Sequence, residues 1–147
     1  MLSWPSRACR AGAAVGRGLR IVQMLRDVAL VALGGSVGAG LRYSVGVWLS
    51  QRLSRGFPWH TFTVNVFGAF LLGLLMSVSV EHSGWGRWQL FAGVGLLGGF
   101  TTFSTFSYET LRLLEDGATA AAAGNALGSV AAGLLAAAAG LAVGRAI

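Results

Sequence analysis

Charged residues stand far apart in this chain, and their spacing is its most restrictive feature. The four longest gaps between charges hold 24, 25, 21 and 28 residues, interrupted only by Arg42 in the first gap. A helix that crosses a lipid bilayer needs about 20 mostly apolar residues. We therefore predict an all-α integral membrane protein with four transmembrane helices, at about 28–50, 59–80, 88–113 and 118–144.

The composition excludes several other classes of protein. Apolar residues make up 54% of the chain and charged residues 11%, with a mean hydropathy of +0.67. Soluble domains carry roughly 25% charged residues. The single cysteine excludes a disulfide framework and a cysteine-based metal cluster. All 11 basic residues are arginine, and five of them lie within the first 26 positions, so the chain offers no basic face that would bind nucleic acid.

Aromatic and basic residues bear on how the helices sit in the membrane. The tryptophans that fall at predicted helix ends, as in an aromatic belt, are Trp48, Trp59, Trp85 and Trp88. Short connections predict that consecutive helices run antiparallel. From Met24 onward each side of the membrane would carry three arginines, so the positive-inside rule gives no preferred orientation. Such a chain is expected to insert both ways and to pair head to tail.

Residues 1–23 differ from the rest of the chain. They contain four arginines and no acidic residue, a composition also found in targeting segments. Met24 directly precedes the first apolar stretch, so we expect the native product to begin there. This divides the chain into an N-terminal extension, 1–23, and a four-helix membrane domain, 24–147. If the extension is retained, its arginines favour a cytoplasmic N-terminus.

Glycines four residues apart predict close helix packing. The pairs are Gly34 and Gly38, Gly95 and Gly99, Gly124 and Gly128, and Gly140 and Gly144. Small residues at this spacing let two helix backbones approach each other in lipid. We interpret these glycines as packing positions and not as the lining of a pore.

Polar residues within apolar spans are costly and therefore informative. Asn65 lies in the second span, where its amide must find a partner: either another helix or a permeating solute. In the third span, Gly98 and Gly99 precede a series of β-branched and hydroxyl residues that is unfavourable for a helix. We predict a break near 98–102. Freed backbone groups there could coordinate a cation through carbonyls or an anion through amides.

Two phenylalanines follow this predicted break. Phe103 and Phe106 are three residues apart and so share one helix face. They are either a packed aromatic pair or ring edges that meet an anion, because the edge of an aromatic ring is its positive part. Conduction requires weak binding at several sites, and the chain contains no lysine that would hold an anion tightly.

Three segments resemble the signatures of the fluoride channel family (Fluc, CrcB-type). They are GGSVGAGLRY at 34–43, TVNVFGAFLLG at 63–73 and GGFTTFSTFSYE at 98–109. The resemblance covers roughly residues 26–145, and the third segment is highly specific. It implies an antiparallel, dual-topology homodimer of four-helix subunits with a broken third helix. It also implies passive, selective export of fluoride across the inner (plasma) membrane, which relieves fluoride toxicity.

The resemblance also implies roles for individual residues. Phe103, Phe106 and Asn65 match pore residues, and the carbonyls of Gly98 and Thr101 match ligands of one structural sodium ion per dimer. Further residues of the polar fluoride path would be Thr102, Ser104, Thr105, Glu109, Asn125 and Ser129. The last two are the only polar candidates in the fourth span, which is sparser than is usual in the family. Arg42 matches an arginine of the first signature, for which the resemblance implies no definite role. The alternative is that its guanidinium snorkels to the membrane interface.

Other functions find less support. A small multidrug transporter also has four spans, but it needs a carboxylate within the membrane, and only Glu109 could lie within a span. A scaffold subunit would explain the glycines and leave the third signature unexplained. His60 and His82 lie at predicted interfaces with no nearby nucleophile or second ligand, so we expect no enzyme. The glycine spacing at 93–98 resembles a dinucleotide fingerprint, but it follows no strand.

Overall fold

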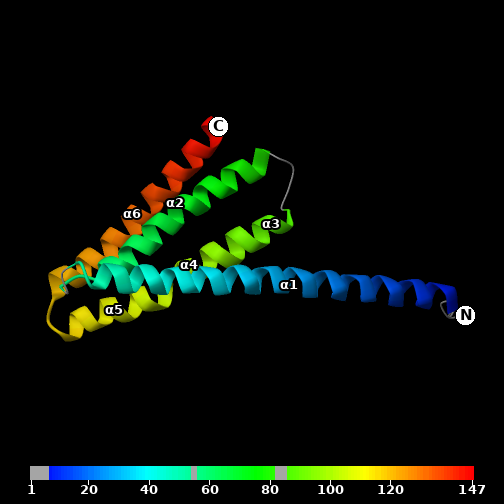
Figure 1. Ribbon diagram of the computed structural model, residues 1–147, viewed down its shortest axis with the longest axis horizontal. Helices are drawn as coiled ribbons and strands as arrows, with labels where there is room; N and C mark the ends of the chain where they lie inside the picture. The colour runs from blue at the N-terminus through cyan, green and yellow to red at the C-terminus, as the bar shows by residue number, and fades with distance from the viewer. Residues whose placement is uncertain (1–6, 54–55, 82–85) are drawn as a thin grey trace, which may run out of the picture.

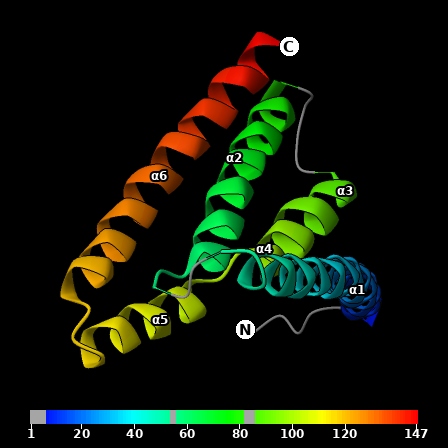
Figure 2. The same cartoon turned by 60° about the vertical axis from the view of Figure 1, so that its left-hand side comes forward.

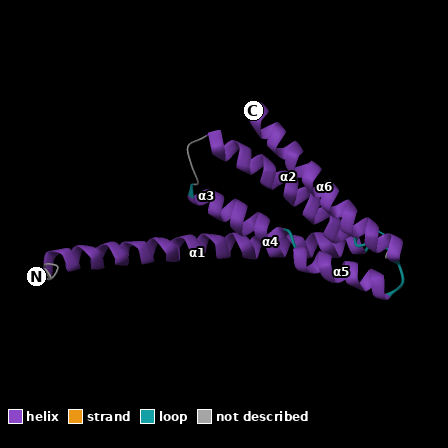
Figure 3. Cartoon of the chain, turned by 180° about the vertical axis from the view of Figure 1, so that it is seen from behind, coloured by secondary structure: helices purple, strands orange, loops and turns teal. Residues whose placement is uncertain are grey.

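The computed structural model describes residues 7–53, 56–81 and 86–147, and every regular element in these ranges is helical (Figure 3). Three spans are single helices: α1 (Arg7–Ser50), α2 (Trp59–Glu81) and α6 (Thr119–Ala146). The third span is built from α3 (Arg87–Gln89), the π-helix η1 (Leu90–Leu97), α4 (Gly98–Phe100) and α5 (Phe103–Glu115). Four segments are long and apolar enough to cross a membrane, which confirms the four predicted spans.

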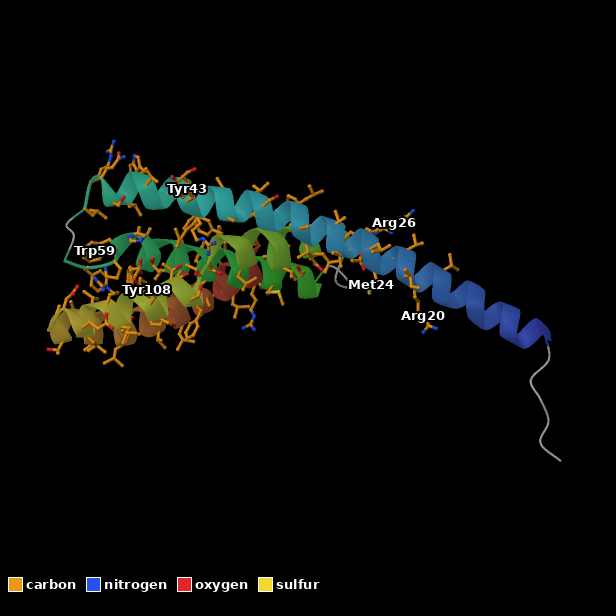
Figure 4. The ribbon with its side chains drawn as sticks, turned by 90° about the horizontal axis from the view of Figure 1, so that it is seen from below. Arg20, Met24, Arg26, Tyr43, Trp59 and Tyr108 are labelled. Carbon is orange, nitrogen blue, oxygen red and sulfur yellow. The ribbon has the colours of Figure 1, made fainter. Side chains whose placement is uncertain are left out.

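Helix α1 is longer than predicted. Its 44 residues correspond to about 66 Å at 1.5 Å per residue, roughly twice the thickness of the hydrocarbon core. The charges near its start do not end the helix, since the sequence contains no proline between residues 7 and 50. The N-terminal part of α1 projects beyond the other helices (Figure 1), and Figure 4 shows Arg20 on this projecting part.

The remaining helices form two packed groups that meet near the interruption between α4 and α5. Helices α2 and α6 lie side by side along most of their length, and η1 and α4 pack against α1 (Figures 1 and 2). Helix α5 lies beyond the break and contacts α6. The third span therefore contacts α1 through its first half and α6 through its second half.

Glycines bring the backbones of both groups into contact. A methyl group at Gly140 would clash with the carbonyl oxygen of Phe70, and one at Gly38 with that of Leu96. Three of the predicted glycine pairs thus pack helices, since a methyl group at Gly34, Gly95, Gly99 or Gly144 would also lie less than 3.0 Å from a neighbouring atom. Within the single chain, Gly124 and Gly128 make no close backbone contact, because sequence spacing does not reveal which face of α6 meets α2.

Adding one methyl group at Gly140 should therefore destabilise the protein. Gly140→Ala would push α6 away from α2, at a cost of about 1–3 kcal/mol for overpacking. The measurement is thermal unfolding in detergent, where the midpoint should fall. Gly128→Ala is the matched control in the same helix, because no atom lies within 4 Å of the added carbon. Equal midpoints for the two variants would contradict the packing argument.

Three of the four tryptophans expected in an aromatic belt lie at helix ends. Trp48 is exposed near the end of α1, where the Arg52 guanidinium lies 4.6 Å from its ring centroid. Trp59 begins α2, and Trp88 lies exposed in α3. Trp85 and His82 lie outside the described residues.

Candidate functional site

The third span is interrupted at Thr101 and Thr102, which we call the break. Both residues have extended backbones, with ψ 158° at Thr101 and φ −151°, ψ 122° at Thr102. The predicted interruption near 98–102 is therefore present, and it lies at the C-terminal end of that range. Thr102 is the N-cap of α5, because its hydroxyl accepts a hydrogen bond from the Thr105 amide at 3.3 Å, a role that threonine favours.

The π-helix before the break was not predicted. At its end the Gly98 amide donates to the Gly93 carbonyl, five residues earlier. π-Helical segments are rare and occur frequently at functional sites. In η1, Gly95 lies close to the backbone of α1: a methyl group there would be 2.7 Å from the Val31 carbonyl oxygen. The wider helix thus coincides with the closest approach of α1 to the third span.

Side chains from α1 and α2 bind three of the backbone groups that the break exposes. The Asn65 amide makes two bonds with Thr102: its Nδ2 donates to the Thr102 carbonyl at 3.0 Å, and its Oδ1 accepts from the Thr102 amide at 2.8 Å. Arg42 donates from Nη1 to the Thr101 carbonyl at 3.2 Å. Arg42 therefore binds the break and does not snorkel to the interface. Broken helices are stable in membranes only where such partners exist.

Hydroxyl groups gather at the start of α5. The Thr102 hydroxyl lies 3.2 Å from that of Ser104 and 3.1 Å from that of Thr105. The first amides of a helix have no partner within the helix and carry partial positive charge. The start of α5 thus presents several neutral donors within one turn, an arrangement that suits a small anion.

The two predicted pore phenylalanines lie next to each other on α5. Their ring centroids are 5.6 Å apart, with an interplanar angle of 42°. Phe103 is 78% exposed, and Phe106 is half-buried. Within a single chain the Phe103 ring therefore has almost no partner surface except Phe106.

A second polar chain connects α5 with α6. Ser129 donates to the side-chain carbonyl of Asn125 at 3.2 Å, and Asn125 donates to the Thr110 hydroxyl at 2.8 Å. Thr110 in turn donates to the Phe106 carbonyl at 2.8 Å. Asn125 is completely buried, so its amide depends on these partners. Sequence reasoning missed Thr110, although it lies one helical turn after Phe106 on the same face.

His60 and Glu109 are also brought together by the fold. The His60 Nε2 atom lies 2.9 Å from Glu109 Oε1. Sequence reasoning treated His60 as an interfacial residue without a partner, because nothing local connects the start of α2 with the middle of α5. Glu109 itself lies one turn beyond Phe106 and next to Thr110.

The carbonyl groups predicted to bind sodium flank the end of α4. In a continuous helix the Thr102 amide would donate to the Gly98 carbonyl, but here it donates to Asn65. The Gly98 carbonyl is thereby released. The Thr101 carbonyl accepts from Arg42 and keeps a second lone pair. Unwound carbonyls of this kind suit Na⁺, but two oxygens are too few to surround an ion without further ligands.

Comparison with known proteins shows which family and which relatives the chain resembles. The profile of the family described as CrcB-like protein, Camphor Resistance (CrcB), matches residues 29–141. A protein of Thermus thermophilus, named fluoride-specific ion channel FluC, is 50% identical over 118 residues, or 80% of this chain and 93% of the relative. A protein of the same name from Agrobacterium fabrum is 43% identical over 120 residues, or 81% and 96% of the two chains.

The match includes every residue of the site described above. The relatives are named as ion channels and not as enzymes, and the four apolar helices make the chain a multi-pass protein of the cell membrane. Both the identity and the coverage are high enough to establish common ancestry across the whole membrane domain. The chain belongs to the CrcB-like family.

Proposed function

We propose that this protein is a passive, fluoride-selective ion channel that exports fluoride from the cell and so relieves its toxicity. The observation that carries the proposal is the 50% identity to a protein named fluoride-specific ion channel, over a match that includes the break. We prefer this function to those of a small multidrug transporter or a scaffold subunit. It alone accounts for the third signature, at residues 98–109.

The proposed path for the ion begins at the break and runs along α5. An anion would meet the hydroxyls of Thr102, Ser104 and Thr105, then the ring edges of Phe103 and Phe106. Beyond them it would pass Glu109 and the polar chain of Thr110, Asn125 and Ser129. Asn65 retains one N–H that no described residue accepts, since only its other N–H is needed for Thr102. Each contact is weak, as rapid conduction requires.

A head-to-tail homodimer would complete this path. Phe103 is exposed in the single chain, and a cavity of about 550 Å³ beside it is lined by Asn65, Thr101 and Thr102, among others. A second copy would cover both. The equal number of arginines on the two sides of the membrane, counted from Met24 onward, supports insertion in both orientations.

We further propose that one sodium ion lies at the centre of this dimer. The Gly98 and Thr101 carbonyls of both copies would supply its ligands, and membrane lipid would surround the assembly. The ion would add a fixed positive charge between the two copies. The support is the released Gly98 carbonyl and the cavity that both residues line.

The function can be tested with purified protein in liposomes. Liposomes loaded with potassium fluoride should release fluoride when valinomycin is added, without any proton gradient. Liposomes loaded with potassium chloride should release chloride at least about 100 times more slowly, because a larger halide fits a hydroxyl-lined path poorly. Empty liposomes are the control. Equal release of chloride and fluoride, or no fluoride release above the control, would contradict the proposal.

A further inference from the structure

His60 and Glu109 lie where the proposed path leaves the helices. Both residues line a cavity of about 320 Å³ between α5, the end of α1 and the start of α2. Figure 4 shows their chain neighbours, Trp59 and Tyr108, at this same end of the molecule. Since Glu109 follows Phe106 by one helical turn, an anion that has passed Phe106 reaches Glu109 next.

Glu109 presents an electrostatic problem at this position. Its side chain is only 18% exposed, and its Oε2 atom is buried with no hydrogen-bond partner among the described residues. A partly buried carboxylate repels an approaching anion more strongly than an exposed one, because water screens it less. The one side chain bound to it is His60, at 2.9 Å from Oε1.

Other charged groups also lie at or near the cavity. Arg112 and Asp116 line the cavity from the end of α5, and Arg112 lies 3.6 Å from Glu115 in an exposed pair. Beyond the end of α1, Arg52 lies over the Trp48 ring. The residues that α1 and the described part of the following segment contribute to the cavity are uncharged. Among the described residues, His60 is the side chain that contacts the Glu109 carboxylate, and Arg112 is a permanent positive charge at the same cavity.

We propose that His60 is a positioning residue whose protonation controls how fast anions pass Glu109. In both protonation states its Nε2–H can hold the carboxylate in place. Only the protonated imidazolium places a positive charge beside the Glu109 carboxylate. Fluoride flux should therefore rise as the pH falls. This inference rests on the proposed function and adds a regulatory residue to it.

The pH dependence of fluoride efflux tests the proposal. Flux through the wild-type protein should increase about fivefold from pH 8 to pH 6, the size of effect expected when one partly screened charge near the path is cancelled. His60→Gln keeps a hydrogen-bond donor without a charge, so its flux should not change with pH. Glu109→Gln removes the negative charge that protonated His60 would cancel, so its flux at pH 8 should exceed that of the wild type. Protein-free liposomes are measured at each pH, because hydrogen fluoride crosses lipid unaided.

The matched control is His82→Gln, the same change at the other histidine of the chain, which should keep the wild-type pH dependence. All variants must elute from a sizing column as the wild type does, and Glu109→Gln provides an independent test if His60→Gln does not. A wild-type flux that is constant with pH, or a His60→Gln flux that still rises at low pH, overturns the role of His60 alone. No fluoride flux at any pH overturns the proposed function, and this inference with it.

Discussion

An Asn65→Asp channel is expected to conduct fluoride at least about 100 times more slowly than the wild type. The carboxylate would still accept the Thr102 amide, but it could not donate to the Thr102 carbonyl, which Asn65 Nδ2 binds at 3.0 Å. Two oxygens would then face each other at the break, and leaving a buried acceptor unpaired costs about 1–3 kcal/mol. The new negative charge would also repel fluoride within the path. Efflux from liposomes and thermal unfolding in detergent measure the two effects.

Two further variants separate lost hydrogen bonds from added charge. Asn65→Ala removes both bonds to Thr102 without adding a charge, so it should lower the unfolding midpoint and slow the flux less than Asn65→Asp does. Asn125→Asp adds the same charge at a completely buried position, where the Thr110 hydroxyl already donates to the Phe106 carbonyl. Its unfolding midpoint should therefore fall at least as much as that of Asn65→Asp. Wild-type flux through Asn65→Asp would remove Asn65 from the path.

The spans and the break could be predicted because both follow from local properties of the chain. A gap of about 20 uncharged residues is long enough to cross a bilayer whatever it packs against. The glycines and β-branched residues at 98–102 disfavour a helix by their own conformational preferences. Such signals can be recognised within a short window of sequence, so they do not depend on knowing the fold.

Partnerships between helices could not be predicted in this way. The start of α2 and the middle of α5 are far apart in sequence, so neither His60 nor Glu109 indicates its partner at 2.9 Å. Thr110 bonds Asn125 on α6 for the same reason. Arg42 is the clearest example: a lone arginine in an apolar span suggests snorkelling, and only the fold brings the freed Thr101 carbonyl within 3.2 Å of it.

Glycine spacing lies between these two cases. The four-residue interval correctly identifies residues that let backbones approach, as at Gly140 and Gly38. It does not identify the neighbour, so it also selects Gly124 and Gly128, and it misses Gly73, where a methyl group would clash with the Ala137 backbone. The interval defines a helix face, and the fold decides whether that face is covered.

Replacing Phe106 by isoleucine should reduce fluoride flux by at least about tenfold and leave the protein folded. Isoleucine retains an apolar side chain at a half-buried position, so the cost in stability should stay below about 1.5 kcal/mol. It removes the positive ring edge that the anion is proposed to meet. Phe91→Ile is the matched control, because Phe91 lies in η1 beside Leu33 and Trp88, away from the break. Efflux from liposomes should fall for Phe106→Ile and stay near the wild-type rate for Phe91→Ile. Wild-type flux through Phe106→Ile would show that the ring edge takes no part in conduction, and the path would then rest on the hydroxyls and amides alone.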